Sequence, residues 1–127
     1  MPDFIDVQRV GKVAVITLNR PKLNALSRAM QDEIAQAARE LSSDDSVRAV
    51  VIHGGERSFA AGADVKEMVH WDHAMAWEQT PRLQAAFTAV ADMPQPTIAA
   101  LIALASHRCS GSEKGPAIHS LIFQTRV

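Results

Sequence analysis

One segment of the sequence places small and charged residues in an order that could do chemistry. It runs from residue 54 to residue 68 and reads Gly-Gly-Glu-Arg-Ser-Phe-Ala-Ala-Gly-Ala-Asp-Val-Lys-Glu-Met. Small side chains let a ligand approach the backbone closely, and the N–H groups at a helix start point toward developing negative charge. A short helix beginning at Asp64 would give this segment the features of an oxyanion hole. A tight strand-to-helix turn explains the same composition, so composition alone leaves both interpretations open.

Four separated motifs follow one another along the chain. They are Asn19-Arg20-Pro21, Asn24-Ala25-Leu26, the run from Ser58 to Met68, and Pro96-Thr97-Ile98-Ala99-Ala100. Together they resemble the crotonase family, best known from enoyl-CoA hydratases, over residues 4 to about 100. The resemblance implies an α/β fold built as a spiral of β-β-α units and an acyl-CoA thioester as substrate, with no tightly bound cofactor. It also implies an assembly that is usually a homotrimer or a hexamer.

The resemblance further implies roles for individual residues. The backbone N–H of Ala63 would be the first of two donors that bind the thioester carbonyl oxygen. Losing one such donor typically costs on the order of 3 kcal/mol in barrier, because the donors stabilise an enolate-like state. Lys22 and Lys66 could reach the CoA phosphates, although both could also be solvated surface lysines. The residues implied to line the CoA site, largely through backbone atoms, are Ala61, Ala63, Asp64, Val65 and Lys66.

The family pattern is lost after Ala105. The family normally continues with a Gly-Gly-Gly-x-Glu motif, which supplies the second donor and an acid/base glutamate. Counted without gaps, Arg108 falls on the donor glycine and Gly111 on the glutamate, and the chain ends at about half the usual family length, before the second glutamate. Glu113 comes two positions late, and a misplacement of even about 1 Å can cost roughly 100-fold in rate. We therefore predict an acyl-CoA-binding protein of the hydratase/isomerase type, whose parental reaction is syn hydration of a 2-enoyl-CoA, but a poor hydratase.

Two other hypotheses remain. The chain could be a non-catalytic CoA-binding or interaction fragment that associates with an intact relative, or an incompletely folded product that exposes apolar strands. The abrupt loss of the pattern after Ala105 also suggests a reading-frame shift in a longer parent. Finding no Gly-Gly-Gly-x-Glu in either alternative frame of the encoding DNA would contradict that idea.

Other candidate residues give weaker signals. His70 and His73 have the spacing of metal ligands, but no third ligand is marked nearby, so we expect no metal site. Cys109, two residues after His107, has no recognisable acid/base partner. His53 lies at a strand end and is expected to be structural. Four large side chains are expected to pack a cover on the acyl side: Met68, Trp71, Met75 and Trp77.

The elements that must position these residues alternate between strand and helix. Residues 4–9 and 13–18 predict a hairpin, and Ser27 is a plausible N-cap for a helix that reaches about residue 41. Residues 47–52 and 97–102 predict buried strands, and a helical region between residues 72 and 93 should be interrupted near Pro81. This order implies a parallel α/β sheet. Residues 1–105 are predicted to be the N-terminal part of a crotonase-like domain, and residues 106–127 a divergent tail that is either a loop or disordered. Its final residues, 118–127, are too short to supply a missing layer.

Composition excludes several classes of function. The chain has 127 residues with 13 Lys+Arg and 14 Asp+Glu, a net charge of -1 that gives no overall field to recruit nucleic acid or an anionic membrane. The longest apolar stretch, residues 98–105, is far shorter than the roughly 20 residues of a membrane helix. A single cysteine excludes an internal disulfide framework, and the first residues lack a secretory signal. The sequence therefore predicts a cytoplasmic protein.

Overall fold

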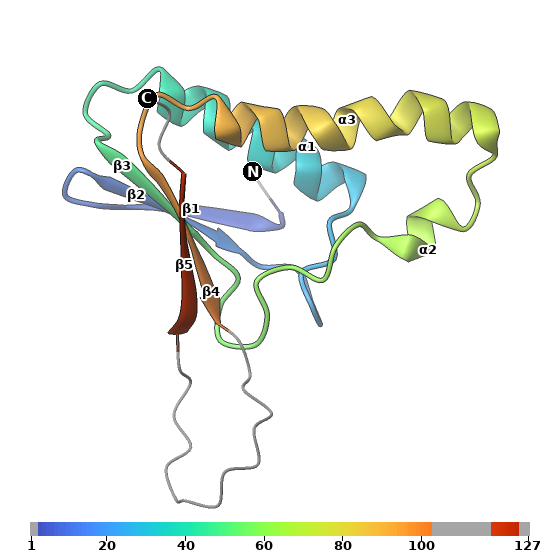
Figure 1. Ribbon diagram of the computed structural model, residues 1–127, viewed down its shortest axis with the longest axis horizontal. Helices are drawn as coiled ribbons and strands as arrows, with labels where there is room; N and C mark the ends of the chain where they lie inside the picture. Colours follow the sequence, from blue (N-terminus) through green and yellow to red (C-terminus); the bar gives the residue numbers. More distant parts are fainter. Residues whose placement is uncertain (1–2, 103–117, 125–127) are drawn as a thin grey trace, which may run out of the picture.

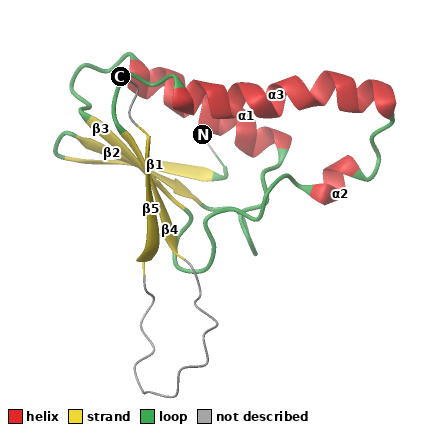
Figure 2. Ribbon diagram, viewed as in Figure 1, coloured by secondary structure: helices red, strands yellow, loops and turns green. Residues whose placement is uncertain are grey.

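The computed structural model of the chain describes residues 3–102 and 118–124, and within them five strands form one mixed sheet (Figures 1 and 2). The sheet order is β1-β2-β3-β4-β5, with β2, β3 and β4 parallel and with β1 and β5 antiparallel at the two edges. The predicted α/β class is confirmed. The strands are β1 (Ile5–Val10), β2 (Val13–Leu18), β3 (Ala49–His53), β4 (Thr97–Ile102) and β5 (Ile118–Gln124), and the helices are α1 (Arg28–Ser42), α2 (Val65–Met68) and α3 (His73–Ala91).

The β1–β2 hairpin follows from its alternating side chains. In β2 every second residue is buried, namely Ala14, Ile16 and Leu18, so one face of the strand points into the core. Gly11 has a φ of 61, a left-handed conformation that suits a two-residue hairpin turn. The predicted hairpin is confirmed, with Val10 paired to Val13 across the turn.

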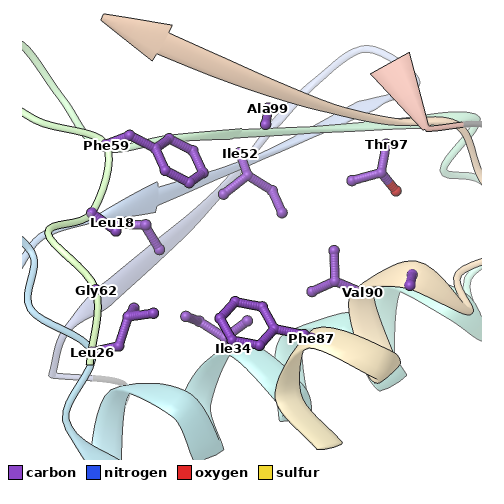
Figure 3. A pocket seen from close by; sticks show the side chains of 12 residues that line it. Leu18, Leu26, Ile34, Ile52, Phe59, Gly62, Phe87, Val90, Thr97 and Ala99 are labelled. Carbon is purple, nitrogen blue, oxygen red and sulfur yellow. The ribbon is translucent and has the colours of Figure 1, made fainter. Parts of the chain in front are cut away.

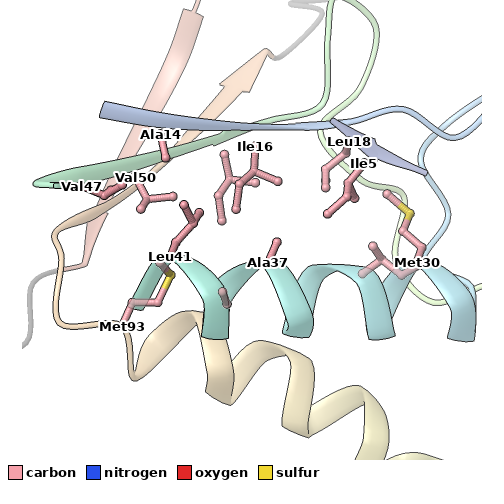
Figure 4. Close-up of a cluster of buried hydrophobic side chains, with 13 residues drawn as sticks. Ile5, Ala14, Ile16, Leu18, Met30, Ala37, Leu41, Val47, Val50 and Met93 are labelled. Atoms are coloured by element: carbon pink, nitrogen blue, oxygen red, sulfur yellow. The ribbon is translucent and has the colours of Figure 1, made fainter. Parts of the chain in front are cut away.

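Helix α1 covers this buried face of the sheet. Its predicted N-cap is confirmed, because the Ser27 hydroxyl accepts the N–H of Met30 at 3.3 Å. Figure 4 shows Met30, Ala37 and Leu41 of α1 pointing toward the side chains of the strands above them. The apolar residues at helical spacing therefore form the buried face of α1, as the sequence predicts, and the core lies between α1 and the sheet.

Helix α3 runs without a break through Pro81, so the predicted interruption there is wrong. Proline lacks the N–H that would bond the carbonyl four residues earlier. Pro81 is exposed, so water can reach the carbonyl that is left free. In Figure 1, α3 lies beside α1 on the same side of the sheet and runs in the same direction, and its N-terminal half extends past the start of α1.

Part of the predicted tail joins the sheet. Strand β5 pairs antiparallel with β4, from Thr97 opposite Gln124 to Ile102 opposite Ile118. The strand adds an edge to the sheet but no new layer. The loop predicted for residues 106–116 lies outside the described residues. Among the helices of residues 3–102, none is both long and apolar enough to cross a membrane.

Glu33 of α1 holds the N-terminal residues against the fold. Its carboxylate accepts three successive backbone N–H groups, from Asp3 at 3.0 Å, Phe4 at 2.9 Å and Ile5 at 3.1 Å. Hydrogen bonds to an ionised acceptor are stronger than neutral ones. These hydrogen bonds also position Phe4, and the guanidinium carbon of Arg20 lies 5.6 Å from the centroid of the Phe4 ring. The first described residues are thereby connected to the segment that contains Arg20.

Candidate functional site

The segment that carries Ala63 lies alongside residues 23–26 as a short parallel bridge. The N–H of Leu26 donates to the carbonyl of Gly62 at 2.8 Å, and the N–H of Asp64 donates to the carbonyl of Leu26 at 3.1 Å. Backbone groups of successive extended residues point in opposite directions. The N–H and C=O of Ala63 therefore point away from Leu26, and within residues 3–102 and 118–124 the Ala63 N–H has no hydrogen-bond partner. This N–H is therefore available to an acceptor on a ligand.

A small cavity of about 180 Å³ adjoins this donor. Apolar side chains form most of its wall, whereas two carboxylates stand on the side of α2. Ala63 borders the cavity directly, so a carbonyl group entering it could meet the free N–H. The residues around it are Leu26, Gln31, Ala63, Asp64, Glu67, Met68, Trp71, Thr80 and Leu83.

Asn24 holds the loop that precedes this segment. Its side-chain amide is buried and donates to the carbonyls of Gly54 at 2.8 Å, Ser58 at 3.0 Å and Phe59 at 3.1 Å. Because the amide has only two hydrogens, at least one of them is shared between two carbonyls. The Oδ1 atom accepts the backbone N–H of Arg20 at 2.8 Å. One side chain thus fixes both ends of the loop after β3.

Gly54 is required by the close approach of this loop to itself. A Cβ at this position would lie 2.1 Å from the carbonyl oxygen of Ser58 and 2.3 Å from that of Phe59. Both neighbours are backbone atoms that Asn24 also binds, so they cannot move aside without breaking those hydrogen bonds. The glycine after β3 therefore serves a tight backbone crossing that brings residues 58–63 back toward the sheet.

Arg20 and Asp64 fix the other end of the segment. Their side chains form an ion pair at 2.6 Å, and the Arg20 Nη1 atom donates to the carbonyl of Ala25 at 2.7 Å. Asp64 is buried and also caps α2, since its Oδ1 accepts the N–H of Lys66 at 3.0 Å. The hydrogen bond from Arg20 lowers the pKa of the Asp64 carboxyl, and the Lys66 N–H adds to the effect. The charge at the N-cap is thereby kept.

Three of the residues predicted for the CoA site have a backbone N–H that is already hydrogen-bonded within the protein. The N–H groups of Ala61, Asp64 and Lys66 already bond to the Leu23 carbonyl, the Leu26 carbonyl and the Asp64 carboxylate. These three residues therefore have no free N–H to offer a ligand, and a backbone contact from Ala61 would have to use its carbonyl oxygen. Val65 is 68% exposed, and Lys66 is exposed too. Lys22 is exposed with a φ of 77.

Two other predictions can be compared with the structure. His53 is structural, as predicted: its Nδ1 atom accepts the N–H of Gly55 at 3.1 Å, and its Nε2 atom lies 3.0 Å from the Thr17 hydroxyl. The predicted acyl-side cover is wrong for Trp77, which is 80% exposed and lies outside the cavity, whereas Met68 and Trp71 line it. Within the described part of the chain, no group of three His, Cys, Asp or Glu could hold a metal ion. The positions His107, Arg108, Cys109, Gly111 and Glu113 lie outside it.

Arg20 and Asn24 belong to two of the sequence motifs, but the sequence predicts no individual role for either residue. The structure shows that they hold the loop and the Ala63 segment in place. The available signal was an asparagine between Pro21 and the Ser27 cap, since asparagine tolerates the left-handed conformation that Asn24 adopts, with a φ of 51.

Comparison with known proteins identifies the family. A family model described as enoyl-CoA hydratase/isomerase matches residues 8–105, so the chain belongs to the enoyl-CoA hydratase/isomerase family. Probable enoyl-CoA hydratase echA8 of Mycobacterium bovis is 42% identical over 100 residues, which cover 78% of this chain and 38% of that protein. The mitochondrial enoyl-CoA hydratase of Pongo abelii is 42% identical over 89 residues, covering 56% of this chain and 31% of that one.

Solved structures show the same fold. DspI of Pseudomonas aeruginosa superposes with a TM-score of 0.74 at 34% identity, covering 78% of this chain and 38% of that one. An enoyl-CoA hydratase/carnithine racemase of Magnetospirillum magneticum gives a TM-score of 0.75 at 36% identity, with 78% and 39% covered. The predicted crotonase fold is confirmed for the matched part, and the chain spans less than half the length of these relatives.

Proposed function

We propose that the chain binds an acyl-CoA thioester, with the thioester carbonyl oxygen accepting the N–H of Ala63. The observation that carries this proposal is the unpaired Ala63 N–H at the wall of the 180 Å³ cavity. Membership of the enoyl-CoA hydratase/isomerase family supports it, because enoyl-CoA compounds contain this carbonyl group. The apolar wall of the cavity suits a short acyl chain.

The chemistry that one donor can provide is limited. A hydrogen bond aimed at the carbonyl oxygen stabilises an enolate-like state more than the ground state, which lowers the barrier to hydration or isomerisation. Syn hydration also needs a second donor and two carboxylates to move protons, and the sequence lacks the motif that supplies them. We therefore propose acyl-CoA binding with little turnover. This overlaps with the second hypothesis, a non-catalytic CoA-binding fragment.

Further parts of the proposal concern the CoA moiety and the assembly. Lys22 and Lys66 are exposed cations on the two segments that flank Ala63, so they are the proposed phosphate contacts. A trimeric or hexameric assembly and a cytoplasmic location stay predictions.

Calorimetry and NMR together test the proposal. We expect both CoA and a short acyl-CoA to bind, and only the acyl-CoA to shift the amide proton of Ala63, because free CoA has no thioester carbonyl. The amide of Gly55 is a control, since it is already bonded to His53. An enoyl-CoA should be hydrated at well below about 1 per second. Absence of binding, or an unchanged Ala63 amide, would contradict the proposed site, and turnover at ordinary enzyme rates would contradict the predicted lack of activity.

A further inference from the structure

The cavity beside Ala63 offers a ligand more hydrogen-bond acceptors than donors. Its free donor is the N–H of Ala63. Its acceptors come from the side chains of Gln31, Glu67 and Thr80, which belong to three different helices. A thioester carbonyl can accept from the Ala63 N–H, but it has no hydrogen to donate to the other groups. A ligand that satisfies the whole cavity must therefore carry hydrogen-bond donors of its own.

Gln31 of α1 contributes an amide oxygen that has no partner. The residue is only 7% exposed, and its Nε2 atom donates to the carbonyl of Leu26 at 2.9 Å. Within the described part of the chain its Oε1 atom accepts no hydrogen bond, yet it is not fully enclosed, unlike the Oε1 atoms of Gln79 and Gln95. Because Gln31 borders the cavity and is otherwise buried, the cavity is the space that this oxygen faces. A donor on a ligand would remove the cost of leaving it unpaired.

Glu67 of α2 contributes a negative charge that no cation of the described residues pairs with. Its Oε2 atom accepts the backbone N–H of Arg28 at 3.0 Å, and its Oε1 atom has no hydrogen-bond partner among those residues. Asp64, the other carboxylate of the cavity, is already paired with Arg20. The hydroxyl of Thr80 donates to a backbone carbonyl and keeps its lone pairs for a donor. The cavity therefore combines one unpaired charge with two neutral acceptors.

Leu26 also borders a wider hollow of the opposite character. Apolar side chains line this groove of about 490 Å³, and Figure 3 shows Phe59 on one wall and Phe87 on the other. No charged side chain of the described residues lines it. A plain hydrocarbon in the groove would leave no charge unpaired, whereas in the cavity it would leave the free acceptors without donors. The polar groups of the cavity are therefore a basis for selecting among acyl groups.

We propose that the cavity selects acyl-CoA thioesters whose acyl group carries an ammonium group, a substrate class that rests on the acyl-CoA binding proposed above. The thioester carbonyl accepts from Ala63, and a primary ammonium group has three hydrogens for the three acceptors. Its positive charge also balances that of Glu67. A hydroxyl group has one hydrogen and no charge, so it satisfies one acceptor only. The volume of about 180 Å³ restricts the acyl group to a short chain. Gln31 and Glu67 are the specificity-determining residues.

Calorimetry on the full chain with three compounds of nearly equal size tests the proposal. Butanoyl-CoA, 3-hydroxypropanoyl-CoA and 3-aminopropanoyl-CoA differ only in ending the acyl chain with a methyl, hydroxyl or ammonium group. We expect the amino compound to bind at least about tenfold more tightly than butanoyl-CoA, with the hydroxyl compound between them.

Two variants with matched controls assign this preference to the cavity. Gln31→Met and Glu67→Gln should each reduce it to less than about threefold, and Glu67→Gln should do so without weakening the hydroxyl compound. The Leu26 carbonyl keeps a partner in Gln31→Met, since it also accepts the N–H of Asp64 at 3.1 Å. Gln36→Met and Glu78→Gln are the controls, because both side chains are exposed and lie outside the cavity.

The outcomes separate this inference from the proposed function. If butanoyl-CoA binds and the amino compound binds no more tightly, the ammonium selectivity is overturned and the proposed function stands. If none of the three compounds binds, both are overturned. A preference that survives both cavity variants, or that the controls abolish equally, overturns the roles of Gln31 and Glu67. Circular dichroism identifies variants that keep the wild-type fold, and Glu67→Gln alone decides if Gln31→Met does not.

Discussion

The Arg20 guanidinium lies 2.6 Å from the carboxylate of Asp64, and this ion pair ties the segment after β2 to the N-cap of α2. Asp64 directly follows Ala63, so the pair also restrains the direction of the Ala63 N–H. Buried charges are tolerated when they are paired and hydrogen-bonded, and both conditions hold here. The ion pair thus links the stability of the loop to the geometry of the proposed site.

This ion pair predicts a loss of stability in acid. A carboxyl whose pKa is lower in the folded than in the unfolded chain adds stability above its unfolded pKa, and the contribution is lost as the pH falls through the folded pKa. Hydrogen bonds lower the pKa of Asp64, first from Arg20, and lower that of Asp44 from 3.8 to about 2, first from Ser46 and then from Arg9. We expect the free energy of unfolding to fall as the pH drops below about 4.

Urea unfolding at neutral pH and at about pH 3 measures this effect. Asp64→Asn should lower the stability at neutral pH and reduce the difference between the two conditions. Asp45→Asn serves as the control, because Asp45 is an exposed carboxylate next to Asp44. An unchanged acid response in Asp64→Asn would show that the Arg20 pair does not contribute to it.

Asn24→Ala should destabilise the fold by about 2–3 kcal/mol, because three backbone carbonyls lose their shared donor. Asn24→Asp keeps the shape but turns a carboxylate toward the same oxygens, so we expect it to be at least as harmful. Equilibrium unfolding in urea gives both values. Asn19→Ala, an exposed asparagine in the same segment, should change stability by less than about 0.5 kcal/mol. Equal effects at the two asparagines would refute the role assigned to Asn24.

Gln79→Met should stabilise the chain. Gln79 is buried in α3, and its Oε1 atom has no hydrogen-bond partner within the described residues. A buried acceptor without a donor costs about 1–3 kcal/mol, and methionine fills a similar volume without that cost. We expect a gain of about 1 kcal/mol, seen as a higher midpoint in thermal or urea unfolding. The same change at the exposed Gln84 of α3 should have little effect, and a loss of stability in Gln79→Met would mean that the amide is satisfied.

Pro81→Ala should also stabilise the chain, through the helix itself. Proline inside a helix costs about 3 kcal/mol, although it recovers up to about 1 kcal/mol by restricting the unfolded chain. Because α3 runs through Pro81 without a break, the net expected gain is about 2 kcal/mol. Urea unfolding measures it, with Arg82→Ala as the exposed neighbour for comparison. No gain would indicate that the proline sits at a relaxed bend of α3.

The local elements were predictable because local chemistry determines them. The Gly11 turn, the Ser27 cap and the Asp64 cap each depend on neighbours within a few residues, and each appears in the structure where the sequence places it. The direction of the Ala63 N–H follows from the bridge to Leu26, which no local pattern in the sequence encodes.

Features that depend on distant contacts were not predictable. Asn24 binds carbonyls 30 to 35 residues away, and nothing in the sequence around it marks those partners. Trp77 is a large, mostly apolar residue of the kind expected in a core, but the N-terminal half of α3 extends past α1 and leaves its side chain in solvent. Strand β5 was missed because its pairing with β4 joins segments separated by residues without apolar periodicity.

The hydrogen bonds from residues 3–5 to the Glu33 carboxylate have a practical consequence for expressing the protein. Trimming the chain to begin at Ile5 would remove two of the three amide donors and the aromatic ring on which Arg20 rests. Since Arg20 is also paired with Asp64, such a shortening would weaken the support of the segment that contains Ala63. An expression vector for this protein should therefore retain Asp3 and Phe4.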